Sequence, residues 1–206
     1  MQVVYNREGI GDVLLLTLHQ TDEKTTVEQY GDVTRIAKAD TNEAVAYNIF
    51  NASAYLDVNH YELLNIDEEF VKQVDSIFKQ NDLNESLHVD VSPKFVVGQI
   101  DQLDSHEDSS KLSVCHVNVG DEQLQIVCGA PNVAEGQKVV VAKVGAIMPS
   151  GLEIKDSELR GVSSTGMICA ARELNLPNAP QEKGILVLDD QETVGEPFAL
   201  SMYRSG

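Results

Sequence analysis

Two glycine-containing blocks in the second half of the chain constrain its fold most. In the first, apolar residues recur at alternate positions 124, 126 and 128, and this pattern stops at the Gly-Ala-Pro-Asn sequence of 129 to 132. This pattern is typical of a half-buried strand that runs into a tight turn. In the second block, 159 to 169, a strand leads to small hydroxyl residues and then to Gly166 and Met167. Such a loop can present backbone donors, hydroxyls and one flexible apolar side chain to a partner.

The sequence predicts two domains, 1–92 and 93–206. A length of 206 residues is at the upper end for one domain and sufficient for two domains that each bury a core. The boundary is predicted near Asp90-Val91-Ser92-Pro93-Lys94. At this point helical periodicity gives way to strand-like alternation, and a proline restricts the backbone.

The first domain is expected to be an acidic α+β domain of unknown role, with several strands and one principal helix. The helix is predicted over 67 to 80, where acidic residues occupy the first turn and the helix dipole favours negative charge. Asn65 or Asp67 is expected to cap it, and Asn81 to end it. Its apolar positions recur at helical spacing: Phe70, Val74, Ile77 and Phe78. Strands are expected at 2 to 6, 13 to 19, 26 to 37 and 44 to 50, with turns at 9 to 11 and 30 to 32.

The second domain is expected to be an all-β barrel of the oligonucleotide-binding type, the OB fold. Gly, Pro and Asn turns separate short strands, and a short helix is expected around 171 to 176. Five short strands suit a small closed barrel, and closure removes exposed sheet edges. The strands are expected at 95 to 103, 111 to 119, 122 to 128, 138 to 144 and 184 to 188.

Residues 94 to about 200 closely resemble the tRNA-binding OB domain at the start of the bacterial phenylalanyl-tRNA synthetase beta subunit. Five ordered blocks carry the resemblance: residues 95 to 100, 111 to 120, 126 to 132, 140 to 146 and 160 to 167. The whole chain, with the sequence Tyr47-Asn48-Ile49-Phe50-Asn51 in its first domain, resembles the stand-alone bacterial YtpR-type proteins. The resemblance implies noncatalytic binding of folded tRNA through its backbone and shape, and it raises homodimerisation by analogy.

The resemblance also implies which residues contact tRNA. In related barrels the serine aligned with Ser164 bonds a phosphate or ribose, and the methionine aligned with Met167 lies against a base or sugar. A different interpretation stays open, in which the loop is a tight turn whose serines bond their own backbone and whose methionine enters the core. Lys138 and Lys155 are further cations available for phosphates. The candidate tRNA-binding residues are Lys111, Lys143, Arg160, Ser164, Gly166 and Met167.

Net charge opposes nucleic-acid binding. The formal net charge is −18, of which −11 falls in residues 1–92 and −7 in residues 93–206. Screening limits the repulsion of RNA to about 8 Å at physiological salt, so a local cationic patch can still bind phosphates. Glu107 and Asp108 add negative charge where the resembling domains commonly have proline and a neutral polar residue. The alternative function is therefore a protein–protein interaction or dimerisation module derived from a tRNA-binding barrel.

The sequence contains no pattern of an active site, a metal site or a cofactor site. It lacks a phosphate loop, a complete dinucleotide fingerprint and a nucleophile elbow. The spacing of Cys115, Cys128 and Cys169 matches no structural zinc site, so these residues are expected to be reduced, buried thiols. No apolar run reaches the roughly 18 residues of a membrane helix, and a secretory signal is not evident. We therefore expect a cytoplasmic, noncatalytic protein with no cofactor, metal, membrane partner or small-molecule substrate.

Overall fold

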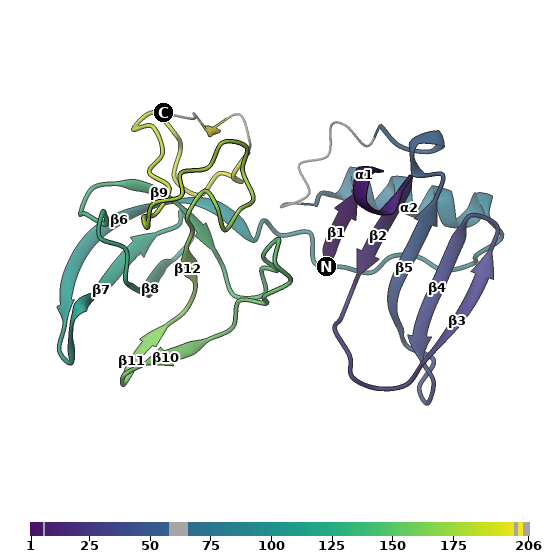
Figure 1. Cartoon of the computed structure of the whole chain (residues 1–206), viewed down its shortest axis with the longest axis horizontal. Helices are drawn as coiled ribbons and strands as arrows, with labels where there is room; N and C mark the ends of the chain where they lie inside the picture. The colour runs from purple at the N-terminus through teal and green to yellow at the C-terminus, as the bar shows by residue number, and fades with distance from the viewer. Residues whose placement is uncertain (6, 58–65, 200–201, 204–206) are drawn as a thin grey trace. The chain divides into compact units, whose positions relative to one another are not determined.

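Two five-stranded sheets organise the chain, one in each half (Figure 1). The structure, a computed structural model, describes residues 1–5, 7–57, 66–199 and 202–203. The chain divides into two units, Met1–Ser92 and Pro93–Gly206. Within the residues that are described, no helix is long and apolar enough to cross a membrane.

The first sheet is antiparallel throughout and has the strand order β1-β2-β5-β4-β3. Its strands are β1 Gln2–Tyr5, β2 Val13–Thr17, β3 Thr25–Tyr30, β4 Val33–Lys38 and β5 Ala44–Phe50; the short helices α1 Arg7–Ile10 and η1 Ala52–Ala54 join them. These strands confirm the predicted ones, except that Asn6 lies outside the described residues. The predicted turn at 30 to 32 joins β3 to β4, with Gly31 at a φ of 52°.

Helix α2, Glu68–Gln80, covers one face of this sheet (Figure 1). The Asp67 carboxylate accepts a hydrogen bond of 2.8 Å from the Phe70 amide, so Asp67 is the N-cap. The helix ends at Asn81, whose side chain accepts from the Asp32 amide and donates to the Ile77 carbonyl. The predicted apolar positions are all buried against the sheet: Phe70, Val74, Ile77 and Phe78.

The predicted helix and its Asp67 cap are confirmed, and Asn65 lies outside the described residues. The unit is nevertheless largely strands, because five strands accompany this one long helix in the described part of it. We therefore describe it as mainly β, and the structure does not clearly support the expected α+β class.

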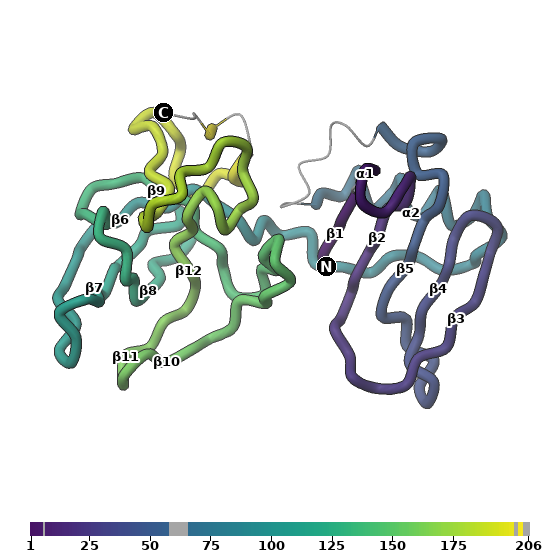
Figure 2. Tube along the Cα trace, viewed as in Figure 1, coloured from purple at the N-terminus to yellow at the C-terminus, as the bar shows by residue number. Residues whose placement is uncertain are grey.

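The second sheet has the order β12-β9-β6-β7-β8. Its strands are β6 Phe95–His106, β7 Ser109–Asn118, β8 Gln123–Cys128, β9 Lys138–Ala142 and β12 Met167–Ile168; β10 Ser157–Leu159 and β11 Val162–Ser164 form a separate hairpin. Strands β6 to β9 confirm four of the five predicted strands. After β12 the chain, yellow-green to yellow in Figure 2, consists of turns and isolated bridges as far as it is described.

Two sequence predictions for this last part are wrong. The strand expected at 184 to 188 is a single bridge between Val187 and Val139. The helix expected around 171 to 176 is a run of turns, because Asn175 has a left-handed φ of 55° and Pro177 follows two residues later.

The two edges of the second sheet meet, so the sheet closes into a barrel. The Thr165 amide donates to the Gln125 carbonyl of β8 at 2.8 Å, and the Gln125 side chain donates to the Ser163 carbonyl at 2.8 Å. Inside lie apolar side chains from all five strands, including Ile100, Val117, Ile126, Val141 and Ile168. Cys115, Cys128 and Cys169 are buried, as predicted, and none of the three forms a disulfide in this structure.

Candidate functional site

Arg160 lies at the tip of the β10–β11 hairpin. Leu159 pairs with Val162, and the two residues between them, Arg160 and Gly161, have φ values of 48° and 82°. Two successive residues with positive φ form the type of tight turn whose twist matches a hairpin. The Arg160 guanidinium donates to the Asp108 carbonyl at 3.0 Å, so this tip contacts the turn between β6 and β7.

His106 joins the same two hairpins, a role that sequence reasoning missed. Its Nδ1 atom accepts from the Asp108 amide at 3.1 Å, and its Nε2 atom lies 3.0 Å from the Leu159 carbonyl. Since an amide only donates and a carbonyl only accepts, the buried ring is neutral with its proton on Nε2. The sequence offered one indication of this role: the resembling domains also have a histidine at this position, although Glu107 and Asp108 beside it differ from their usual residues.

Lys111 and Arg160 lie at the end of the barrel where these hairpin turns meet. Lys111 is exposed on β7, three residues after Asp108, and Arg160 is exposed at the opposing tip. Glu107 and Asp108 are exposed at the same turn. Two of the expected cations are therefore available to solvent here, with carboxylates beside them.

Lys143 is held by acids. Its Nζ atom lies 2.8 Å from the Glu122 carboxylate and 3.5 Å from the Asp121 carboxylate, and 22% of its side chain is exposed. The hydrogen bond with Glu122, with the charges of both carboxylates, raises the pKa of Lys143. A phosphate could bind this ammonium group only in competition with both acids.

Two hydroxyls of the loop 163 to 167, those of Ser164 and Thr165, bond the backbone of β8. Ser164 is 2% exposed; its hydroxyl accepts from the Val127 amide at 3.1 Å and donates to the Gly166 carbonyl at 3.4 Å. Thr165 bonds the Gln125 carbonyl through its hydroxyl at 3.2 Å. This geometry fits the interpretation of the loop as a tight turn, because the Ser164 hydroxyl is buried and its one proton is already donated to the Gly166 carbonyl.

Gly166 is required by the close approach of two strands. Its φ is 152°, and a Cβ atom at this position would lie 3.1 Å from the Ala142 carbonyl oxygen and 3.3 Å from Ile126. A side chain here would strain the backbone and crowd β9. Gly166 therefore acts in this structure as a packing residue.

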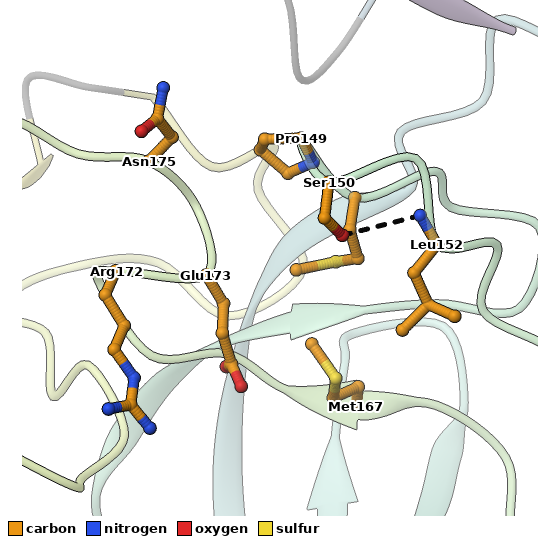
Figure 3. Close-up of a pocket in the computed structure, with 8 residues that line it drawn as sticks. Pro149, Ser150, Leu152, Met167, Arg172, Glu173 and Asn175 are labelled. Atoms are coloured by element: carbon orange, nitrogen blue, oxygen red, sulfur yellow. Dashed lines mark hydrogen bonds between the residues drawn. The ribbon is translucent and has the colours of Figure 1, made fainter.

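Met167 faces an open pocket instead of the barrel core (Figure 3). It pairs with Ala142 at the start of β12 and is partly exposed. The pocket, which we call the methionine pocket, has a volume of about 480 Å³ and is lined by Met148, Leu152, Met167, Arg172, Glu173 and Asn175 together with 149 and 150. Met167 is thus the member of the predicted loop whose side chain reaches a surface that a ligand could occupy.

The Gly-Ala-Pro-Asn turn after β8 anchors the C-terminal part of the chain. The Asn132 side chain accepts from the Ile185 amide at 2.8 Å and donates to the Ile185 carbonyl at 3.0 Å. Gly184 lies against this amide, since a Cβ atom on it would be 3.0 Å from the Asn132 Oδ1 atom. The motif is therefore explained by packing and backbone bonds.

The six candidates do not form one patch. Lys111 and Arg160 share the hairpin end, Met167 lines the methionine pocket, and Ser164 and Gly166 close the barrel. Among the residues with a described placement, no group of three His, Cys, Asp or Glu side chains could hold a metal ion.

Comparison with known proteins identifies both halves of the chain. A family model described as "Putative tRNA binding domain" matches residues 95–197, and a model described as a domain of unknown function matches residues 20–90. The "Putative tRNA-binding protein YtpR" of Bacillus subtilis is 55% identical over 199 residues, which cover 96% of this chain and 99% of that protein.

The second half also matches a part of larger proteins. The phenylalanine–tRNA ligase beta subunit of Oleidesulfovibrio alaskensis is 53% identical over 106 residues, which cover 52% of this chain and 13% of that subunit. Among solved structures, the MetRS related protein from Pyrococcus horikoshii has a TM-score of 0.38 and 19% identity, covering 59% of this chain and 92% of that chain. This structural likeness is too low to carry an argument.

Proposed function

Since this chain belongs to the family of YtpR-type tRNA-binding proteins, we propose that it binds tRNA and catalyses no reaction. The observation that carries the proposal is the identity of 55% along nearly the whole chain with a relative named as a tRNA-binding protein. The match of the tRNA-binding family model to residues 95–197 supports placing the proposed activity in the second unit. We assign the closed barrel of this unit to the OB fold, which commonly binds oligonucleotides.

The proposed interaction is with the backbone and shape of folded tRNA. Aromatic residues make up 5% of the chain and tryptophan is absent, so a row of stacking platforms for successive bases is unavailable. Phosphate contacts from exposed cations then supply most of the affinity, and Lys111 and Arg160 are the proposed contacts at the hairpin end. Since tRNA acts in the cytoplasm, the proposal places this chain there as well.

The acidic charge of the chain predicts weak tRNA binding with a shallow dependence on salt concentration. Each phosphate neutralised by a lysine or arginine releases condensed counterions, so affinity falls as salt rises. Because the second unit has net charge −7, few cations contribute and the slope of log affinity against log salt is shallow. The size of this slope is proportional to the number of phosphates that the chain neutralises.

Filter binding of the full chain to unfractionated bacterial tRNA, at two salt concentrations, tests the proposal. We expect retention of tRNA that decreases at the higher salt concentration, with duplex DNA at equal phosphate concentration as the control for nonspecific attraction. Retention no greater than that of a filter without protein would overturn tRNA binding.

A protein-interaction or dimerisation module is the second candidate function. The observation that favours it lies in the first unit, where Val27 is 66% exposed and Phe50 is 40% exposed. Both belong to the sheet face that points away from the buried positions of β4 and β5. Light scattering that reports a dimer, together with absent tRNA retention, would favour this function over tRNA binding.

A further inference from the structure

We propose that the methionine pocket receives one unstacked nucleotide of the bound RNA, an inference that rests on the proposed tRNA binding. The sequence pattern marks only Met167 of this pocket, because the other walls come from the segment 148 to 152 and the turn after β12. The proposed ligand is a single base with its adjoining phosphate, extruded from the folded RNA.

One wall of the pocket is apolar. Leu152 and Met167 lie on this side (Figure 3), and Met148 also lines the pocket. Leu152 is 59% exposed, so its side chain is available for contact with a ligand. A flat polarisable base would gain contact with thioether groups that adapt to its surface.

The opposite wall is polar. Arg172 and Glu173 lie across the pocket from Met167, and Asn175 lies at its edge (Figure 3). The Arg172 guanidinium can bond a phosphate with two parallel hydrogen bonds. The Glu173 carboxylate accepts from the Ala170 amide at 2.8 Å, so it is fixed in place and can accept from an N–H group on the edge of a base while it repels a phosphate. The apolar wall thus suits the face of a base, Glu173 suits an N–H group on the edge of the base, and Arg172 suits the phosphate.

The pocket is preformed by backbone hydrogen bonds. The Met148 amide donates to the Leu152 carbonyl at 2.8 Å, and the Gly151 amide donates to the Met148 carbonyl at 2.8 Å. The Ser150 hydroxyl accepts from the Leu152 amide at 3.4 Å (Figure 3). Because this segment is already closed, little ordering is needed on binding. A volume of about 480 Å³ lies within the usual range of small-ligand pockets, roughly 300–1,000 Å³, and leaves room for one nucleotide.

Two pairs of exposed residues allow a matched test with the full chain and unfractionated bacterial tRNA. Leu152→Ser removes the apolar wall, and Val187→Ser removes another exposed apolar side chain of the same unit that does not line the pocket. We expect Leu152→Ser to weaken binding about fivefold or more, as loss of contact with one base does, and Val187→Ser to change it less than about twofold.

The cation is tested in the same way. Arg172→Gln and Lys183→Gln change the net charge equally, but only Arg172 lines the pocket. We expect Arg172→Gln to weaken binding several-fold and to reduce the salt slope by about one, with a smaller effect of Lys183→Gln. The unfolding temperatures of all four variants report whether the fold is intact.

A cross-linking measurement identifies the occupant directly. A tRNA transcript that contains 4-thiouridine is irradiated with the full chain, and the cross-linked peptides are mapped by mass spectrometry. Cross-links within 148 to 152 or 167 to 175 support the pocket. If the wild-type chain binds tRNA but the pocket variants match their controls and cross-links fall elsewhere, the pocket proposal is overturned while tRNA binding stands. If the wild-type chain binds no tRNA, the proposed function fails, and the pocket with it.

Discussion

The loop 163 to 167 and the methionine pocket are neighbours with opposite properties. In the loop, the hydroxyls of Ser164 and Thr165 are consumed by bonds to β8. In the pocket, Leu152 and Arg172 are left exposed. Most of the segment with the strongest sequence pattern therefore closes the barrel, whereas the surface open to a ligand is formed by Met167 at its end together with residues that belong to no motif. A loop with a strong sequence pattern can therefore lie beside a binding surface because its packing holds that surface in place.

The largest expected effect tests whether the loop is a structural element. Gly166→Ala should lower the free energy of unfolding of the second unit by about 3 kcal/mol, because the new Cβ atom meets the Ala142 carbonyl at an unfavourable φ. Gly161→Ala is the control: its φ of 82° is also positive, but no atom lies within 4 Å of the new Cβ, so we expect a loss of about 1 kcal/mol. Urea denaturation measures both, and equal losses would show that crowding by β9 is unimportant.

Ser164→Ala should cost about 1–3 kcal/mol of stability, since it leaves the Val127 amide without its acceptor. Ser163→Ala, at the exposed neighbouring position, should change stability by less than about 0.5 kcal/mol. Affinity for tRNA, measured at a temperature where every variant is folded, should stay within about twofold of wild type. A variant of Ser164 that keeps full stability but loses tRNA would restore this hydroxyl as a direct contact.

Lys143→Gln should have a smaller effect, about 1 kcal/mol or less of stability at neutral pH. Because the hydrogen bond with Glu122 raises the pKa of Lys143, the stabilisation is fully present below the unfolded lysine pKa of about 10.4. It is lost as the pH rises through the higher folded value. Denaturation at pH 7 and above pH 10 should therefore show a difference between wild type and variant that shrinks in alkali. A difference that grows with pH would contradict the ion pair.

Lys111→Gln tests an exposed lysine by its effect on tRNA affinity. Lys111 is exposed, so its loss should leave stability nearly unchanged and weaken tRNA binding about two- to threefold, with a slightly shallower salt slope. Lys143→Gln, measured beside it, should affect binding less because Glu122 and Asp121 already hold that ammonium group. Equal losses of affinity would mean that tRNA displaces both carboxylates.

Local patterns in the sequence were sufficient for much of the fold. Helix α2 was predictable because its apolar periodicity and the Asp67 cap lie within one short segment. The strand expected at 184 to 188 failed because an apolar run alone does not reveal that Ile185 pairs with a side chain, Asn132, in place of a strand. The class of the first unit was harder to predict. The strands and the helix were each predicted, but their lengths alone do not decide between an α+β and a mainly β description.

The candidate site was less predictable, because its contacts are not local. The partner of the Ser164 hydroxyl is Val127 on another strand, and no spacing rule connects them. Lys143 lies within a strongly patterned block, yet its acids come from the β7–β8 turn. Leu152 and Arg172 meet across a pocket only after the barrel has closed. Met167 alone among the loop residues had a side chain whose predicted exposure to a ligand fits the structure.

The Asn132 amide imitates a peptide group, offering one donor and one acceptor to the backbone of Ile185. Since neither bond involves the side chain at 185, drift at that position would leave the tether intact. At 132 even the isosteric aspartate would lose the donor and place a carboxylate oxygen against the Ile185 carbonyl oxygen. The tail of this chain is thus held in part by one side chain of a distant turn, fifty-three residues earlier in the sequence.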